Sequence, residues 1–373
     1  MQRKIIIMSL VTAMLLMSAC GKNDGLNRSE GSENSSVMND VTSVSDFAAT
    51  DYITTQVVAN TNIEKLEKGL SVVRFDGNDL FGEFLENHGA ASDTDVVSFL
   101  SGFMLGLSDT VFTNEAFGCS TIAVKSENGY LYGRNFDWNK CDALIVESHP
   151  ADAYASISTV NMDFIKSGAG PLLKILPDDK LSLVALYAPL DGMNEKGLFI
   201  SVNMIQDSAV IDQNTEKDDI TTTTAVRLLL NKASNVDEAV RLLESYDMHA
   251  SFGMMVHFMV ADAEGNSVVC EYIDNELVVT KTQVVTNFYL TEGEKYGIGT
   301  EQSHDRYEKL MEIYDAKSIF EESDVAGALN SVSKHNYGSG ESTEWCIVFN
   351  SYTCEALYFH REDYDKAYRI KLE

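Results

Sequence analysis

The stretch FGCSTIAVKSENGYLYGRNFDW, residues 117–138, decides the fold of this 373-residue chain. Two runs rich in β-branched and aromatic residues flank an Asn-Gly dipeptide, which is a strong signal for a tight hairpin turn. We therefore expect a β-hairpin here. Its second strand would bring Arg134 and Asp137 back beside Cys119, which begins the first strand.

The position of Cys119 allows two interpretations. A cysteine in an apolar strand is most often a small buried hydrophobic residue. If the bond between Gly118 and Cys119 were cut, however, Cys119 would carry both a thiol and a free α-amine, whose pKa of about 7.7–8.0 suits a base at neutral pH. Arg134 would then lower the pKa of the thiol, and Asp137 would hold the charged amine. The alternative for Arg134 and Asp137 is an ordinary ion pair within a sheet.

The composition sets bounds on the whole chain. With 45% hydrophobic residues and 4 prolines, the chain can bury a large core, so we expect one large domain with accessory segments. The 57 acidic and 28 basic side chains give a net charge of −29. Because such a charge repels anionic surfaces, we expect no nucleic-acid partner.

Residues 1–19 predict a signal peptide of the lipoprotein type. Arg3 and Lys4 precede an uncharged run that ends at Met17, which is too short to cross a bilayer core of about 30 Å as a helix. Small residues then lead to Cys20 in a pattern that resembles a bacterial lipobox, in which the cysteine is lipidated. We expect an extracytoplasmic protein anchored to the cell membrane through a lipid on Cys20. Simple cleavage and secretion is the alternative.

Two further segments precede Cys119. Residues 20–46 are rich in Ser, Asn, Gly and Asp, which predicts a flexible tether. Residues 47–118 predict a small α-rich unit, in which Asp93 or Asp95 would cap the last helix. The helical periodicity is seen in residues 63–70, 78–87 and 93–107.

Beyond the hairpin, strand and helix signals alternate in blocks. Strand-like runs occur at residues 181–188, 197–203, 254–262, 267–274, 343–350, 355–360 and 367–372. Helical runs occur at residues 223–233, 236–246, 306–316 and 324–333. This alternation predicts the α+β class, with helices packed on antiparallel sheets.

Four motifs resemble one known family. The segment from Gly118 to Trp138 resembles the start of the N-terminal-nucleophile (Ntn) amidases of the choloylglycine hydrolase superfamily, which includes bile salt hydrolases, penicillin V acylases and acid ceramidase. DGMNEKGLFISVN (191–203), VVTNF (284–288) and SHDRY (303–307) follow in the family's order. The resemblance implies that residues 119–373 form an amidase domain. Its fold would be a four-layer αββα sandwich, preceded here by a small helical pro-segment.

The resemblance also implies roles for individual residues. Cys119 matches the nucleophile, which Arg134 and Asp137 organise. Asn203 and Asn287 match positions that donate hydrogen bonds to the substrate and to the oxyanion, a contribution worth about 10²–10³ in rate per donor in comparable sites. Without the resemblance, both asparagines would be interpreted as turn residues at strand ends.

The same resemblance implies a role for Arg306 and a maturation step. Arg306 matches an arginine that completes the polar network; otherwise it would be a solvated helix residue. The ceramidase-like branch exposes its nucleophile by autoproteolysis, so we predict cleavage between Gly118 and Cys119. Gly118 would assist by adopting a strained backbone. The upstream fragment would either stay bound as a second subunit or separate.

These observations predict a hydrolase that acts on non-peptide carbon–nitrogen bonds in linear amides, with a small-molecule N-acyl amide as substrate. Conjugated bile salts, penicillin V, N-acylethanolamines, N-acyl amino acids and ceramides are all candidates. Phe136, Trp138, Phe199, Met204 and Phe288 would either line an apolar pocket or pack in the core. The alternative function is a non-catalytic, ligand-binding surface lipoprotein on the same fold.

Four further cysteines lie downstream of Cys119. Cys141, Cys270, Cys346 and Cys354 are an even number in an exported chain, which favours one or two disulfides. They include no CxxC pair, so we expect no structural zinc, and without a glycine-rich phosphate loop we expect no cofactor.

Overall fold

The computed structural model describes residues 49–103, 118–169, 176–337 and 340–372, and the chain is uncleaved at Gly118. The predicted signal peptide, Cys20 and the whole of the predicted tether region lie outside the described residues. Within the described ranges, none of the helices is both long and apolar enough to cross a membrane.

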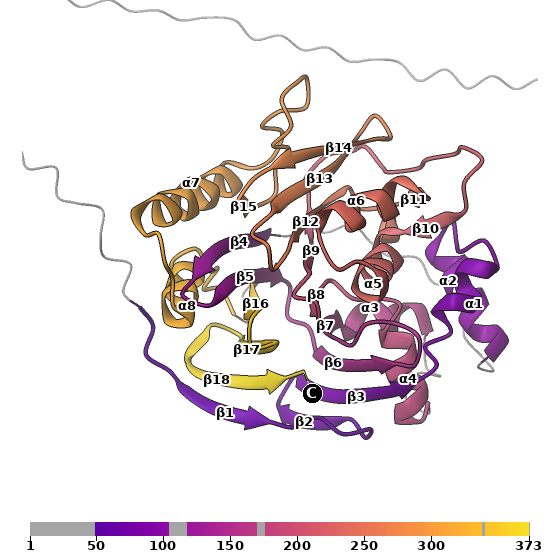
Figure 1. The fold of residues 1–373 in the computed structure, drawn as a ribbon, viewed down its shortest axis with the longest axis horizontal. Coiled ribbons are helices and arrows are strands. Elements are labelled where there is room, and N and C mark those ends of the chain that lie inside the picture. The colour runs from indigo at the N-terminus through magenta and orange to yellow at the C-terminus, as the bar shows by residue number, and fades with distance from the viewer. Residues whose placement is uncertain (1–48, 104–117, 170–175, 338–339, 373) are drawn as a thin grey trace, which may run out of the picture. The chain divides into compact units, whose positions relative to one another are not determined.

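One sheet of seven strands contains the predicted hairpin (Figure 1). In spatial order its strands are β1 (Ile53–Val57), β18 (Asp363–Lys371), β17 (Glu355–His360), β16 (Ser342–Asn350), β5 (Gly129–Trp138), β4 (Gly118–Ser126) and β15 (Val284–Val285). The pairing of β4 with β5 places Gly118 opposite Asp137 and Thr121 opposite Arg134. The hairpin prediction is therefore confirmed.

A second sheet of nine strands faces the first. Its spatial order is β14 (Glu276–Lys281), β13 (Ser267–Ile273), β12 (Val256–Ala261), β9 (Phe199–Met204), β8 (Asp191–Asn194), β7 (Ser156–Asn161), β6 (Ala143–Pro150), β3 (Leu70–Gly77) and β2 (Glu64–Glu67). A separate pair is formed by β10 (Asp219–Thr221) and β11 (Asp247–His249).

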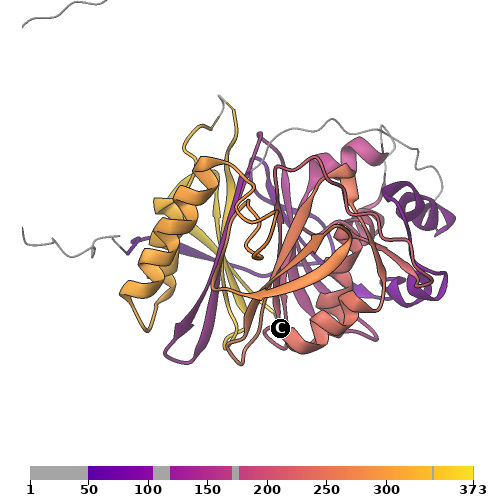
Figure 2. The same ribbon diagram turned by 90° about the horizontal axis from the view of Figure 1, so that it is seen from above.

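Helices cover the outer face of each sheet, as Figure 2 shows. The seven-stranded sheet carries α7 (Glu301–Ala316) and α8 (Glu322–Ser331). On the side of the nine-stranded sheet lie α1 (Phe81–Glu86), α2 (Asp93–Phe103), α3 (Met162–Ala169), α4 (Asp178–Ala185), α5 (Thr222–Lys232) and α6 (Val236–Glu244). Three buried cores separate the four layers, one under each helical layer and one between the sheets. The α+β class and the αββα sandwich are confirmed.

The segment upstream of Gly118 differs from the prediction. Residues 63–70 form β2 and the start of β3, so the helix expected there is wrong. Gly69, at φ +92°, allows the turn between the two strands, and β3 then buries Leu70, Val72 and Val73. The α-rich description holds only for α1 and α2.

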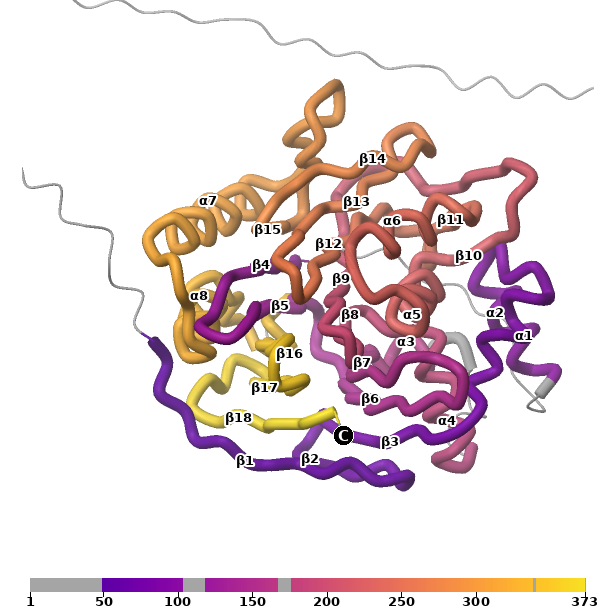
Figure 3. The backbone as a smooth tube through the Cα atoms, in the orientation of Figure 1, coloured from indigo at the N-terminus to yellow at the C-terminus, as the bar shows by residue number. Residues whose placement is uncertain are grey.

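This upstream segment adds strands to both sheets. Strand β1 pairs in parallel with β18, and β3 pairs in parallel with β6. Figure 3 shows the upstream chain running along one edge of the two sheets. The sheets are thus antiparallel, as predicted, except at these two places where the upstream segment joins them.

One further prediction of a strand needs correction. Residues 181–188 do not form a strand, because α4 covers most of them; a short apolar run cannot be assigned to strand or buried helix by periodicity alone. Strands β6 and β7 were not predicted. Their residues are buried on nearly every side, so they lack the alternation of polar and apolar residues that marks a half-exposed strand.

The predicted disulfides are also wrong for the described chain. Cys141, Cys270, Cys346 and Cys354 are all free. Cys270 lies in the core beneath α5 and α6, whereas Cys346 lies in the core beneath α7 and α8, so the fold keeps these two thiols in different layers.

Candidate active site

The six predicted site residues gather around the N-terminal end of β4. Cys119 is on β4, Arg134 and Asp137 are on β5, Asn203 is on β9 of the facing sheet, Asn287 follows β15, and Arg306 is on α7. Each is at least nine-tenths buried. Elements distant in the sequence are therefore needed to assemble the site.

The guanidinium of Arg134 holds the sulfur side of the site. Its Nη2 atom lies 3.8 Å from the Cys119 sulfur and donates to the Val202 carbonyl at 2.9 Å. Its Nη1 atom donates to Asn203 Oδ1 at 2.7 Å, and its Nε atom donates to Asp191 Oδ2 at 2.7 Å. The cation next to the thiol is therefore fixed on all three nitrogens.

Asp191 is a site residue that the sequence analysis missed. Its Oδ2 atom also accepts a hydrogen bond from Trp345 Nε1 at 3.0 Å, and its side chain is fully buried. Because a buried guanidinium needs a buried counter-charge, Asp191 is what allows Arg134 to lie beside the thiol. The signal was present, since Asp191 opens the same motif that ends at Asn203.

Asn287 holds the nitrogen side of the site. Its Oδ1 atom accepts from the Cys119 backbone N–H at 2.6 Å and from Arg306 Nη2 at 2.6 Å. Both partners can only donate, which fixes the orientation of the amide. In the uncleaved chain, Asn287 Nδ2 donates to the Met204 carbonyl at 2.7 Å. The predicted oxyanion donor is therefore already engaged with the backbone of β9.

Asn203 keeps more donor capacity. Its Oδ1 atom accepts from Arg134 and from Thr121 Oγ1, while its Nδ2 atom makes one long contact, 3.4 Å, to Ser201 Oγ. The Nδ2 group of Asn203 is therefore available to donate a hydrogen bond to a developing negative charge.

Arg306 completes the polar network from the helical layer. Its Nε atom donates to Ser120 Oγ at 3.0 Å, and its Nη2 atom donates to the Cys119 carbonyl at 3.3 Å in addition to Asn287. It is not the solvated helix residue of the alternative interpretation, because it is 8% exposed.

Asp137 faces Gly118 rather than an ordinary ion-pair partner. Its Oδ1 atom accepts from Thr343 Oγ1 at 2.7 Å, whereas its buried Oδ2 atom has no hydrogen-bond partner among the described residues. A Cβ atom on Gly118 would lie 2.6 Å from this Oδ2, 2.8 Å from Lys334 Nζ and 3.0 Å from Glu341 Oε1. The ends of three side chains therefore crowd this position, and a side chain at Gly118 would require them to shift.

The predicted reason for glycine at position 118 is therefore wrong. Gly118 lies in the extended strand β4 and does not adopt a positive φ. Glycine suits position 118 because of the close contacts around it, and not because of a strained backbone. Lys334 and Glu341, which pair at 2.6 Å, are further residues of this region that no motif indicated.

Burial dominates the acidity of the nucleophile in the uncleaved chain. Complete burial raises the pKa of the Cys119 thiol, Arg134 and Arg306 oppose this rise, and Asp137 adds to it. The predicted lowering of the thiol pKa by Arg134 is correct as one contribution, but the net shift is upward. The thiol is thus protonated before cleavage.

A small apolar cavity of about 40 Å³ touches Cys119. Of the five apolar candidates from the sequence, Phe136, Trp138 and Met204 line it. The other two pack elsewhere: Phe199 stacks on Tyr132, and Phe288 stacks on His304. The remaining lining residues are Phe164, Leu190, Val202, Thr222, Thr223, Ser251, Phe252, Met254 and Val256.

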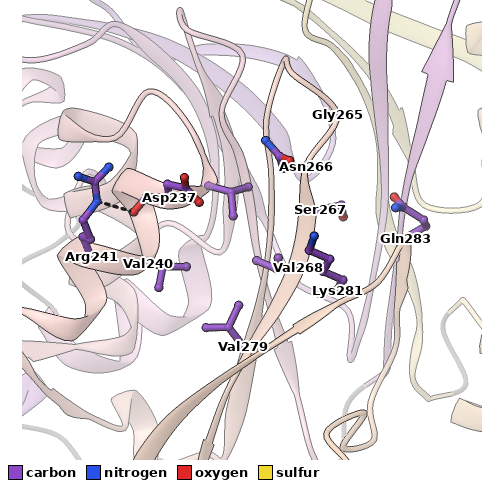
Figure 4. A pocket seen from close by; sticks show the side chains of 11 residues that line it. Asp237, Val240, Arg241, Gly265, Asn266, Ser267, Val268, Val279, Lys281 and Gln283 are labelled. Carbon is purple, nitrogen blue, oxygen red and sulfur yellow. Dashed lines mark hydrogen bonds between the residues drawn. The ribbon is translucent and has the colours of Figure 1, made fainter.

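A larger hollow of about 750 Å³ lies away from this site, between α6 and the strands β13 and β14 (Figure 4). Arg241, Lys281 and Gln283 are among its lining residues, and Arg241 Nε donates to the Asp237 carbonyl at 3.0 Å. None of the six predicted site residues lines it. The chemistry therefore concentrates at the smaller cavity.

A family model matches part of this chain. Residues 186–359 match the family model described as acyl-coenzyme A:6-aminopenicillanic acid acyl-transferase. The match includes Asn203, Asn287 and Arg306 and begins downstream of Cys119. No curated protein matches significantly.

Solved structures show the same fold. A mutant of the conjugated bile acid hydrolase from Clostridium perfringens has 17% sequence identity and a TM-score of 0.51, and a variant of the same enzyme has 16% and 0.52. Both matches cover 68% of this chain and 92% of the other. Penicillin V acylase from Agrobacterium tumefaciens has 18% identity, covers 65% of this chain and 82% of its own, and has a TM-score of 0.46.

Proposed function

We propose that this chain is an Ntn hydrolase of the choloylglycine hydrolase and penicillin V acylase superfamily and that it cleaves the linear amide of an N-acyl compound after autoproteolysis at Gly118. One observation carries the proposal. The sulfur and the backbone nitrogen of Cys119 each contact a different predicted site residue, Arg134 for the sulfur and Asn287 for the nitrogen. A thiol that served only packing would need neither contact.

The maturation step begins with the protonated thiol. The Cys119 sulfur attacks the Gly118 carbonyl carbon, the bond from that carbon to the Cys119 nitrogen breaks, and the thiol proton passes to the released nitrogen. Water then hydrolyses the thioester, leaving a carboxylate on Gly118 and restoring the thiol. Asn287 Oδ1, already 2.6 Å from the nitrogen, remains its acceptor throughout.

The charges around Gly118 favour this reaction. Cleavage creates an ammonium group on Cys119, and Asp137 Oδ2 is a buried carboxylate oxygen that has no partner among the described residues. Cleavage also creates a carboxylate on Gly118, close to Asp137 and Glu341. Lys334 Nζ also lies beside Gly118, so the new carboxylate meets charges of both signs. Substrate enters the cavity beside Cys119 once the new C-terminus has moved aside.

The mature reaction uses the same groups. In its neutral form, which a pKa of about 7.7–8.0 makes accessible near neutral pH, the α-amine takes the proton of the Cys119 thiol. The sulfur attacks the amide carbonyl of the substrate, and the protonated amine gives its proton to the leaving nitrogen. Asn203 Nδ2 is placed to donate to the oxyanion, because Arg134 holds its other amide atom. Water then releases the acyl group from the sulfur.

The cavity supports an apolar acyl group in the substrate. Its wall next to Cys119 is aromatic and aliphatic, with hydroxyl groups only from Thr222, Thr223 and Ser251. Conjugated bile salts, penicillin V, N-acylethanolamines, N-acyl amino acids and ceramides all remain candidate substrates. These candidates differ in the amine that is released, so a panel of substrates is needed to identify it.

We also propose export and anchoring through a lipid on Cys20, on the basis of residues 1–20. The upstream fragment would stay bound after cleavage as a second subunit. This is supported by β1 and β3, which pair with strands of the downstream fragment in both sheets. Retention would keep the catalytic fragment at the membrane.

The test combines mass spectrometry with a substrate panel. Purified wild type should yield two fragments that separate only in denaturant, the second beginning at Cys119, and should hydrolyse at least one N-acyl amide. Cys119→Ala should stay intact and inactive. An active wild type that is wholly uncleaved would refute the proposal. Ligand binding unaffected by thiol alkylation, with no turnover, would favour the alternative of a binding lipoprotein.

A further inference from the structure

The turn from Ser251 to Gly253 forms the movable wall of the cavity. The remaining walls come mainly from strands and the start of α5, whereas Phe252 lies in a short turn and is only partly buried. Phe252 adopts φ +58°, a left-handed conformation that a bulky residue adopts only when its surroundings hold it there. What holds this turn therefore sets the shape of the cavity.

Asp93, from the upstream segment, holds the turn. Its Oδ2 atom accepts the Phe252 backbone N–H at 2.6 Å, and the Ser251 side chain also hydrogen-bonds to the carboxylate. Burial raises the pKa of Asp93, and these hydrogen bonds oppose the rise. The carboxylate thus reaches across from the first residue of α2 to a turn more than 150 positions away in the sequence.

Asp93 is free for this contact because it does not cap its own helix. Ser92 Oγ accepts the Asp95 backbone N–H at 3.2 Å and donates to Asp95 Oδ2 at 2.6 Å. The sequence analysis offered Asp93 or Asp95 as the cap, whereas Ser92 has this role. Asp95 lies on the same helical turn as Asp93 but is exposed, which makes it a matched control.

The rings of Phe252, Phe164 and Trp138 form a row along one wall of the cavity. The ring of Phe252 lies 4.5 Å from the ring of Phe164, which meets Trp138 edge-on at 4.9 Å. The cavity volume of about 40 Å³ is far below the roughly 150 Å³ of a cavity that binds benzene. Any acyl group must therefore displace part of this wall, and Phe252 is one of its partly buried members.

We infer that Asp93 is a positioning residue that determines acyl-group specificity. By fixing Phe252, it sets how large an acyl group the cavity beside Cys119 accepts. The upstream segment is therefore part of the substrate pocket and remains necessary after cleavage. This inference rests on the proposed function in one respect, that the cavity receives the acyl group.

The experiment compares Asp93→Ala, Asp93→Asn and Asp95→Ala with wild type in two assays. The first follows the fluorescence of Trp138 and Trp345 while straight-chain fatty acids of increasing length are added, and it needs no turnover. The second measures kcat and KM for the matching N-acyl amides. Asn can still accept the Phe252 N–H, so Asp93→Asn should retain the length profile of wild type.

Asp93→Ala should shift both length profiles toward longer chains, by about tenfold in KM for the preferred substrate with a smaller change in kcat. Asp95→Ala should match wild type. A wild-type profile in Asp93→Ala, or an equal shift in Asp95→Ala, would overturn the inference. Absence of turnover with every amide would count against the proposed function alone, because the fatty-acid assay still reports on the cavity.

A second variant covers the case in which Asp93→Ala fails to fold. Phe252→Leu leaves Asp93 in place and shortens the wall, so it should broaden the length profile in the same direction. The double variant of Asp93→Asn and Phe252→Leu should have the same length profile as Phe252→Leu alone, because Asn at position 93 still accepts the Phe252 N–H. A further shift in the double variant would show that the charge of Asp93 acts elsewhere.

Discussion

The β4–β5 hairpin and the upstream segment, residues 49–103, serve the same site in different ways. The hairpin supplies atoms that react or contact the reacting atoms, through Cys119, Arg134 and Asp137. The upstream segment supplies none of these, yet it occupies an edge of each sheet and fixes the turn at Phe252. Chemistry in this fold is local to one hairpin, whereas the shape of the pocket depends on a distant part of the chain.

The largest difference between the two regions should be in how a glycine-to-alanine substitution affects cleavage. In Gly118→Ala, the new Cβ atom meets the side-chain ends of Asp137, Lys334 and Glu341 at 3.0 Å or less, so these side chains or the scissile bond must shift. We expect slower cleavage, seen as a smaller share of both fragments on a denaturing gel.

Gly82→Ala, in α1 of the upstream segment, is the control. Nothing lies within 4 Å of its new Cβ atom, and alanine favours a helix over glycine by about 1 kcal/mol. This variant should be cleaved like wild type and be no less stable. Normal cleavage of Gly118→Ala would contradict the proposed role of close packing at the scissile residue.

A second difference concerns the ion pairs of the two regions. Asp191→Asn leaves the fully buried guanidinium of Arg134 without its counter-charge, and breaking such a pair typically costs about 3–5 kcal/mol. The expected result is a large drop in the free energy of unfolding, measured by denaturant titration. In the active enzyme, kcat/KM should fall as well.

The matched change in the upstream segment is Asp76→Asn. Its partner Arg74 lies 3.0 Å away, but both side chains are substantially exposed, at 30% and 45%, and such pairs contribute about 0–1 kcal/mol. Equal losses in the two variants would show that Asp191 does not carry the counter-charge of Arg134.

The same contrast explains which features could be predicted from the sequence. The hairpin was predicted, and the six residues predicted for the site lie close together in the structure, because each motif places particular side chains at fixed local spacing. The strands β1 to β3, the contact of Asp93 with Phe252 and the roles of Lys334 and Glu341 depend on pairing between distant segments, which local periodicity does not report. Asp191 was within reach of sequence reasoning, since a buried arginine predicts a nearby acid.

The smallest expected effect is on stability, and it concerns two His–Glu pairs, His257–Glu271 and His360–Glu67. His257 lies 2.9 Å from Glu271 Oε1 through one ring nitrogen and 2.9 Å from the Thr286 carbonyl through the other. The ring of His257 therefore bridges the Glu271 carboxylate and the backbone beside Asn287. Glu271 also accepts the backbone N–H groups of Leu290 and Thr291, so this pair holds the chain on both sides of Asn287.

This pair predicts a dependence of stability on pH. Burial alone would raise the pKa of Glu271, but the hydrogen bond and the charge of His257 lower it, and the net shift is downward from 4.5. A lowered carboxyl pKa contributes stability that is present above about pH 4.5 and is lost as the pH falls through the lowered value. Wild type should therefore exceed Glu271→Gln by about 1–3 kcal/mol near pH 7 and approach it near pH 3.

The control is Glu67, which pairs with His360 across the boundary between the upstream segment and the rest of the chain. The pKa of Glu67 is also lowered: burial raises it, and the bonds from His360 and Lys366 more than offset the rise. Since Glu67 is partly exposed, solvent screens the pair, and Glu67→Gln should change stability less than Glu271→Gln at every pH. If the two variants lose stability equally, or if the loss in Glu271→Gln persists at low pH, the assignment of a buried charged pair behind Asn287 is wrong.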